Sequence, residues 1–270
     1  MPEFDVSKAK GAIFALKKEI AERERERLGG GARGRHGRDV RRFQPDDRIH
    51  EIGPPLVDPA LRGRPFAVWD FRNGNNAAFL VFTEVSEEWS AASFTIDEKF
   101  GSDFHQHDQI TYYFFWQNDA GRDVVVNIQS ALIIDTFCRI SADNGLIRSP
   151  FWGGSTNGKA RVIVTAELAA MEWWNQPPTQ APAQPSGRQE VRDESISGGF
   201  FLDSAQNIPI SKETYYLHHD GLSVPANGVV VTEVSLNFYY SGHDGGFGCD
   251  YLPEHQNHWT ICPYVHFELT

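Results

Sequence analysis

The residues best suited to chemistry are the histidines, which number ten in the chain. His105 and His107 are separated by one residue, so in an extended strand both imidazoles lie on one face, about 6.6 Å apart at Cα. That spacing can chelate a metal, because zinc or iron needs several nitrogen or oxygen ligands that converge in space. His243 and His258 could complete such a site. The alternative interpretation is that these are surface and loop histidines that form ordinary hydrogen bonds.

Signatures of the common catalytic classes do not occur in the sequence. It has no G-x-S-x-G nucleophile elbow and no cysteine beside a histidine in a known signature, and its glycine-rich stretches 29–31 and 242–246 lack the lysine and the strand-to-helix context of a phosphate-binding loop. Carboxylate pairs are present, but an acidic chain offers many by chance. The sequence therefore indicates a non-catalytic protein without a cofactor. A metal-dependent barrel-type enzyme that uses the four histidines and a divalent metal is the catalytic alternative.

Aromatic residues form a second candidate site. Phe151 and Trp152 lie in the turn-like stretch SPFWGGSTN, and Trp174 adjoins a proline-rich stretch. Flat rings on loops of a β-sandwich stack well on sugars or on another protein. These three residues predict a lectin-like, carbohydrate-binding function as an alternative, and capping of the sandwich edge is the structural interpretation of the same residues.

Charge is distributed unevenly along the chain. The net charge of −11 combines an arm, residues 1–42, that has 12 basic and 7 acidic residues with a body, residues 43–270, that has 13 and 29. An acidic body repels phosphate backbones and anionic lipid, so nucleic acid is not expected as a partner. No apolar run approaches the roughly 20 residues that a membrane span needs.

A helix is predicted over residues 1–28, with Asp5 or Ser7 as its N-cap. Its apolar residues recur at heptad spacing and include Val6, Ile13, Leu16 and Ile20. Two heptads are too few for a coiled coil, so we expect this stripe to dock on the body, on another copy or on a partner protein. A solvated, fraying helix is the alternative. Residues 29–42, which are rich in glycine and arginine, predict a flexible basic linker.

The body has the pattern of an all-β fold. Residues 43–174 contain seven segments rich in β-branched and aromatic residues, separated by Asn-Gly and Gly-Gly turns. This spacing predicts an antiparallel β-sandwich, of jelly-roll or immunoglobulin-like type. Residues 175–195 predict a proline-rich loop or linker, and residues 196–270 a second β unit packed on the first.

Three cysteines, Cys138, Cys249 and Cys262, are an odd number without C-x-x-C spacing, which favours free thiols in a reducing compartment. Cys138 is expected to be a core thiol, and a Cys249–Cys262 bridge is left open if the protein is released. The apolar stretch near the N-terminus is too short for a signal peptide. We therefore expect a cytoplasmic protein, with non-classical release as the alternative.

These observations together predict a non-catalytic β-sandwich protein for binding or assembly. Its N-terminal helix is expected to dock on a partner or on another copy of the same chain.

Overall fold

The computed structural model describes residues 5–28, 58–72, 80–96, 99–143, 158–173, 187–199, 204–249 and 258–270. These residues form one α-helix, α1 (Val6–Leu28), a short 3-10 helix, η2 (Pro59–Leu61), and eleven strands. The strands are β1 (Arg64–Arg72), β2 (Leu80–Val85), β3 (Ser90–Phe94), β4 (Lys99–Gln117), β5 (Val124–Ala142), β6 (Lys159–Glu172), β7 (Gly187–Ser197), β8 (Ser204–Val224), β9 (Val229–Gly248), β10 (Trp259–Cys262) and β11 (Val265–Leu269). The predicted all-β fold with an N-terminal helix is confirmed, whereas the predicted linker 29–42 lies outside the described residues.

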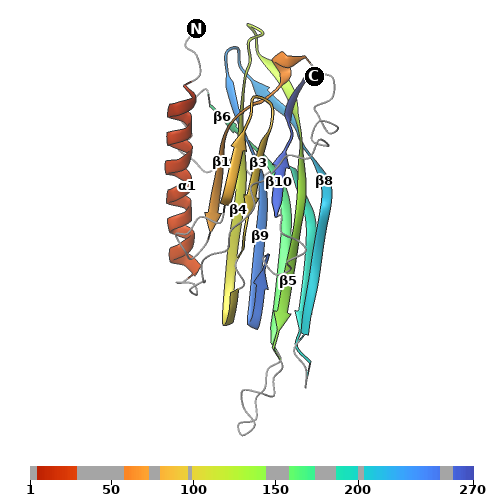
Figure 1. Ribbon diagram of the computed structural model, residues 1–270. Coiled ribbons are helices and arrows are strands. Elements are labelled where there is room, and N and C mark those ends of the chain that lie inside the picture. Colours follow the sequence, from red (N-terminus) through yellow and green to blue (C-terminus); the bar gives the residue numbers. More distant parts are fainter. Residues whose placement is uncertain are drawn as a thin grey trace.

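The strands form two layers that face each other across one hydrophobic core. The helix layer has the order β1-β4-β9-β6-β7, and the opposite layer has the order β2-β3-β10-β5-β8 with β11 also beside β5. All of these pairings are antiparallel. The longest strands, β4, β5, β8 and β9, run along the long axis of the molecule, and α1 lies alongside the helix layer (Figure 1). The antiparallel sandwich that the sequence predicts is therefore present.

Strand β9 is the centre of the helix layer. It pairs with β4 on one side and with β6 on the other, and from Val229 to Tyr239 its residues are buried on both faces, apart from a partly exposed Tyr239. Such burial explains why its sequence starts with an apolar run rather than a strict alternation. Residues with even numbers, such as Leu236 and Phe238, point into the core, and those with odd numbers point outward.

The two layers join at the end of β9. Gly245–Gly248 pairs with Arg139–Ala142 of β5, while the same stretch of chain also approaches β6. A Cβ atom on Gly245 would lie 2.7 Å from the Lys159 carbonyl oxygen and 2.8 Å from that of Ser141. Glycine is therefore required here because backbones from both layers come too close for a side chain.

Some elements differ from their predicted bounds. Strand β7 begins at Gly187, so the last part of the predicted loop 175–195 is wrong, and residues 174–186 lie outside the described residues. Two of the seven segments predicted as strands, 124–134 and 137–141, form the single strand β5, which carries a bulge between Ile134 and Thr136. Strand β9 pairs with β4 and β6, so strands from both predicted β units share one layer. The division into two units stays a prediction.

Candidate functional site

Helix α1 begins at a capping residue, Asp5. Its carboxylate accepts a hydrogen bond from the backbone N–H of Lys8 at 2.9 Å, and its carbonyl accepts one from the N–H of Ala9 at 2.9 Å. An aspartate at this position satisfies donors that have no partner within the helix. The cap fixes where the helix begins above the sheet.

One side of α1 is buried against the outward face of the helix layer. Ala9, Ile13 and Lys17 follow one another at intervals of four residues and are only 1%, 2% and 6% exposed. Ile13 belongs to a cluster with residues of β1, β4, β6 and β9, namely Ala67, Tyr113, Met171 and Val231, bordered by Phe14, Phe66, Trp69, Phe115 and Trp173. The helix therefore docks on its own chain (Figure 1).

A buried ion pair continues this contact. Lys17 Nζ lies 2.8 Å from Glu233 Oε2, and both side chains are almost fully buried. The same ammonium lies 5.9 Å from the centroid of the Trp69 ring, within range of a cation–π interaction. Burial, followed by the negative charge of Glu233, raises the pKa of Tyr113 well above its ordinary value. The contact between helix and sheet thus combines an apolar cluster with one buried ion pair.

The outward face of β9 becomes polar beyond Glu233. Ser235 and Asn237 are both buried there, and Asn237 Nδ2 donates a hydrogen bond to Ser235 Oγ at 3.3 Å. Asn237 Oδ1 lies 3.0 Å from His107 Nε2, and the His107 ring stacks on Tyr239 with centroids 4.2 Å apart. The face that carries α1 therefore passes from an apolar part to a hydrogen-bonding part.

The structure places three of the four predicted docking residues. Ile13 is fully buried, while Val6 and Leu16 are half-buried. The side chain of Ile20 lies outside the described residues. Lys17 is the important residue that the sequence does not predict, because a lysine near an apolar stripe usually keeps its ammonium in water.

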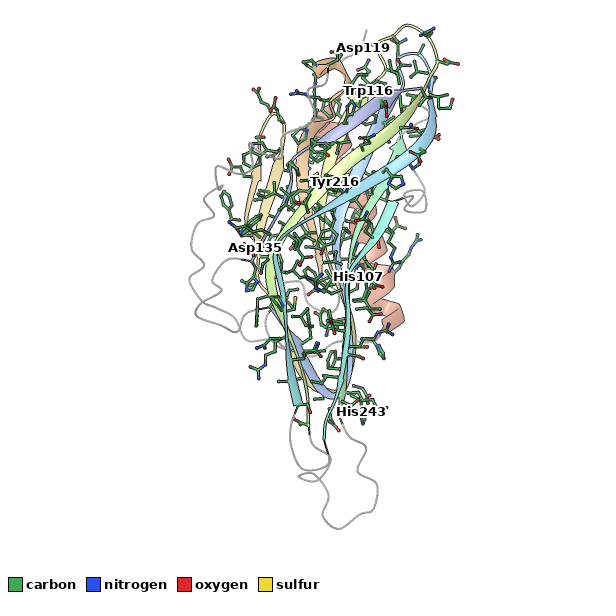
Figure 2. All side chains as sticks on the ribbon, turned by 90° about the vertical axis from the view of Figure 1, so that its right-hand side faces the viewer. His107, Trp116, Asp119, Asp135, Tyr216 and His243 are labelled. Atoms are coloured by element: carbon green, nitrogen blue, oxygen red, sulfur yellow. The ribbon has the colours of Figure 1, made fainter. Side chains whose placement is uncertain are left out.

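The predicted metal ligands do not come together. His105 and His107 lie on the same outward face of β4, as predicted, but His105 is exposed and His107 contacts Asn237. His243 Nδ1 lies 2.8 Å from Asp103 Oδ1 at the far end of the layer, and Figure 2 shows His107 at mid-height and His243 near the lower end.

His258 lies in a different place, buried between β3 and β5. Its Nδ1 is 2.8 Å from Thr136 Oγ1, and its ring centroid is 6.0 Å from that of Phe94. Within the described ranges no group of three or more His, Cys, Asp or Glu residues is arranged to hold a metal ion. The four histidines thus form no common site.

The predicted sugar-stacking residues Phe151, Trp152 and Trp174 all lie outside the described residues, so carbohydrate contact through them stays a prediction. The neighbouring Trp173 packs at the border of the cluster beneath α1. Trp116 is buried, its ring stacks on that of Phe267, and its Nε1 donates a hydrogen bond to the Ala60 carbonyl at 2.8 Å.

The two layers also meet at one side of the sandwich, where edge strands β7 and β8 lie next to each other. In the described part of the chain β7 pairs only with β6, and β8 only with β5. Side chains bridge the two edges instead: Gln189 Nε2 donates to the Tyr216 carbonyl at 2.6 Å, and Gln206 Nε2 donates to Glu194 Oε2 at 2.9 Å. We call this contact the β7–β8 seam.

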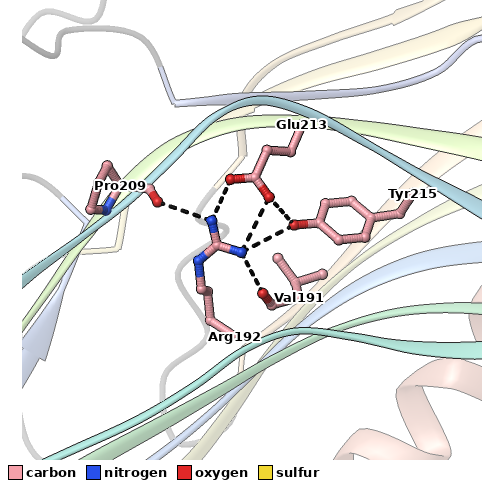
Figure 3. A network of polar contacts seen from close by, with 5 residues as sticks. All are labelled: Val191, Arg192, Pro209, Glu213 and Tyr215. Carbon is pink, nitrogen blue, oxygen red and sulfur yellow. Dashed lines mark hydrogen bonds and ion pairs between the residues drawn. The ribbon is translucent and has the colours of Figure 1, made fainter.

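Arg192 forms the main polar network of the seam (Figure 3). Its guanidinium donates to both carboxylate oxygens of Glu213, to Tyr215 Oη at 3.3 Å and to the Pro209 carbonyl at 3.3 Å. The hydrogen bond from Arg192 lowers the pKa of Glu213. Burial, followed by the Glu213 carboxylate, raises the pKa of Tyr215 to about 12. The network therefore holds Glu213 ionised and Tyr215 protonated at neutral pH.

Replacing Arg192 by glutamine should lower the free energy of unfolding by about 1 kcal/mol at pH 7, a value reduced by solvent screening because the network is partly exposed. The pKa of Glu213 is lower in the folded state than its ordinary 4.5, so this stabilisation is present above that value. It is lost as the pH falls through the folded pKa. Urea unfolding of both proteins at neutral and at acid pH measures the difference, which should disappear in acid.

Arg161→Gln is the matched control for this prediction. Arg161 also pairs with a carboxylate of β7, Asp193, but it lies on the open surface and does not bridge the layers. We expect a smaller effect from this variant. An equal loss in both variants would show that the seam adds nothing to an ordinary surface ion pair.

Comparisons with known proteins do not assign the chain to a family. No family model matches the chain, and no curated protein matches its sequence. A solved structure of TmCBM61 in complex with β-1,4-galactotriose is similar over 78% of this chain and 87% of that chain, with 10% sequence identity and a TM-score of 0.26.

No helix in the described part of the chain is both long and apolar enough to cross a membrane.

Proposed function

We propose that the protein is a non-catalytic assembly protein in which α1 is an exchangeable docking element. Its binding site is the outward face of the helix layer, either on its own chain or on a second copy. The observation that carries this proposal is the buried Lys17–Glu233 ion pair at 2.8 Å inside an otherwise apolar contact. Such a pair makes the contact selective for a helix with a cation at this position, and every copy of the chain provides one.

The length of the connection allows docking on a second copy. Residues 29–57 separate α1 from the first described residue of the body. A segment of about 30 residues can reach roughly 100 Å when extended, whereas a helix of about 23 residues is only about 35 Å long. The helix can therefore exchange between copies without any change in the sheets, which is the geometry of domain swapping.

The size of the contact also favours exchange. Complete burial of a large apolar side chain stabilises a contact by about 1.5–3 kcal/mol, and Ile13 is the only large apolar residue that the described part of α1 buries completely. Ordering the helix on the sheet opposes this gain. A docking free energy of a few kcal/mol leaves a small population of undocked helix, from which exchange can start.

Charge reversal separates docking on the same chain from docking on another copy. Lys17→Glu gives a chain with two carboxylates at the contact, and Glu233→Lys gives a chain with two ammonium groups. Neither helix should dock well on its own body. In an equimolar mixture each helix finds the opposite charge on the other variant, so light scattering should give a species of about twice the 30.4 kDa chain mass.

Two controls accompany this experiment. Lys18 is exposed beside Lys17. A mixture of Lys18→Glu with Glu233→Lys should therefore give no dimer, because Lys18→Glu keeps the Lys17–Glu233 pair within its own chain and exchange would add no further pair. The double variant Lys17→Glu/Glu233→Lys restores an ion pair within one chain. Its helix should therefore dock on its own body without a second variant in the mixture. If the first mixture has the same mass distribution as its two components, exchange of α1 between copies does not occur and the proposal is wrong.

A further inference from the structure

Two buried cysteines meet where the layers join. Cys138 lies in β5 and Cys249 directly follows β9, and their Sγ atoms are 3.1 Å apart. Both side chains are fully buried, and all three cysteines of the chain are free thiols. The third one, Cys262, contacts Ser130 Oγ at 3.4 Å and the Tyr264 carbonyl at 3.6 Å instead. The Cys249–Cys262 bridge that the sequence left open is therefore not the pair that the structure brings together.

The strand register sets the geometry of the pair. Arg139 and Gly248 are cross-strand partners in the β5–β9 ladder, so Cys138 and Cys249 occupy the next position of the register. Directly opposite residues of antiparallel strands have Cα atoms about 4.5–5.5 Å apart, which lies within the range of about 4.4–6.8 Å that disulfides require. The sulfurs need to approach by about 1 Å to reach the length of an S–S bond.

We infer that Cys138 and Cys249 are a disulfide-forming pair that closes when the chain folds in the presence of a small-molecule disulfide such as oxidised glutathione. One cysteine thiolate attacks the glutathione disulfide, forms a mixed disulfide and releases one glutathione thiolate. The second cysteine thiolate then attacks the protein sulfur of the mixed disulfide and releases the other glutathione. Two S–H bonds are lost, one S–S bond forms, and the two electrons reduce glutathione disulfide to two thiols.

Folding is the stage at which this reaction is favoured. Burial raises the pKa of Cys249 well above its ordinary value, and the neighbouring Cys138 thiol raises it further. Because the thiolate is the reacting species, the folded dithiol reacts slowly, whereas the unfolded chain has ordinary, accessible thiols. Once formed, the bond lies in the same buried place and is protected from reduction.

The bond would join the two layers next to the β5–β9 ladder. It would close a loop of about 110 residues, and disulfides that close long loops restrict the unfolded chain most. It does not involve α1, so its presence does not depend on the proposed assembly function.

Refolding from urea in a mixture of reduced and oxidised glutathione tests the inference. We expect one free thiol per chain instead of three, measured after denaturation, and an intact mass lower by about 2 Da. The bridged protein should melt about 5 °C or more above the reduced protein. Proteolytic mapping without reduction should give one linked peptide pair that contains Cys138 and Cys249.

Single substitutions provide the controls. Cys262→Ser should form the bridge and retain no free thiol, whereas Cys138→Ser and Cys249→Ser should not gain the increase in melting temperature. Because a serine at a buried position can itself destabilise the fold, the peptide mapping of the wild-type chain decides the question without any variant. Three free thiols after oxidative refolding, or a linked peptide that contains Cys262, would overturn the inference.

Discussion

Replacing Phe238 by alanine should lower the free energy of unfolding by about 3–5 kcal/mol. Phe238 is fully buried in the middle of β9, and its ring centroid lies 5.5 Å from that of Phe94 and 6.5 Å from that of Phe247. Phe94 belongs to the opposite layer, so the truncation leaves a cavity between the two layers rather than at the surface. Urea unfolding followed by tryptophan fluorescence measures the loss.

The neighbouring residue provides a control for this prediction. Tyr239 points outward from the same strand, is only half-buried and stacks on His107. Tyr239→Ala should cost about 1 kcal/mol, the order of magnitude of one aromatic contact. Equal losses for the two variants would contradict the assignment of inward and outward faces along β9.

Replacing Lys17 by methionine should undock α1. The variant leaves the Glu233 carboxylate buried without its cation, and breaking a buried pair in this way costs about 3–5 kcal/mol. The observed cost cannot exceed the docking free energy of α1, because the Glu233 carboxylate regains contact with water once the helix leaves the sheet. Hydrogen exchange of the amides of α1 measures the effect, and their protection should fall to that of an isolated helix while the protection of β9 remains.

The double variant Lys17→Met/Glu233→Met distinguishes this explanation from simple loss of packing. Replacing both members of a buried pair by apolar residues is often neutral or stabilising. We therefore expect the double variant to regain much of the protection that Lys17→Met loses. Lys18→Met, at the exposed neighbouring position, should change little. If the double variant loses as much protection as Lys17→Met alone, the ion pair does not control docking.

The docking face shows how far the sequence could predict the candidate site. Heptad spacing identifies Ile13 as a docking residue. The pattern allowed docking on the body, on another copy or on a partner protein, and the contacts of Ile13 with the sheet agree with the first of these. The burial of Lys17 could not be recognised, because its partner Glu233 lies 216 residues away in the sequence. A pattern of residue types along one helix contains no information about a charge on a distant strand.

The strands show a similar limit. Val, Ile and Phe alternation identifies most of the central strands, but it misses the first half of β4, because Gln106 and Asp108 point inward there and are buried. Each lies 2.9 Å from Tyr240 Oη, so hydrogen bonds replace apolar contacts. The sequence does not indicate strand β7, because only Gly187 and Val191 of it are buried and its remaining side chains are mostly charged or polar. Edge strands of this kind have no hydrophobic period to detect.

The central place of β9 has a consequence for the order of events during protein synthesis. Its pairing partners β4 and β6 leave the ribosome well before it, since β4 ends at Gln117 and β9 begins at Val229. At about 5–20 residues per second, β4 waits roughly 5–20 s for its long-range partner. During that time the nascent chain exposes strands with unpaired edges, which are prone to aggregate. Yield of the intact protein in cells should therefore depend on chaperones that hold the nascent chain until β9 has been made.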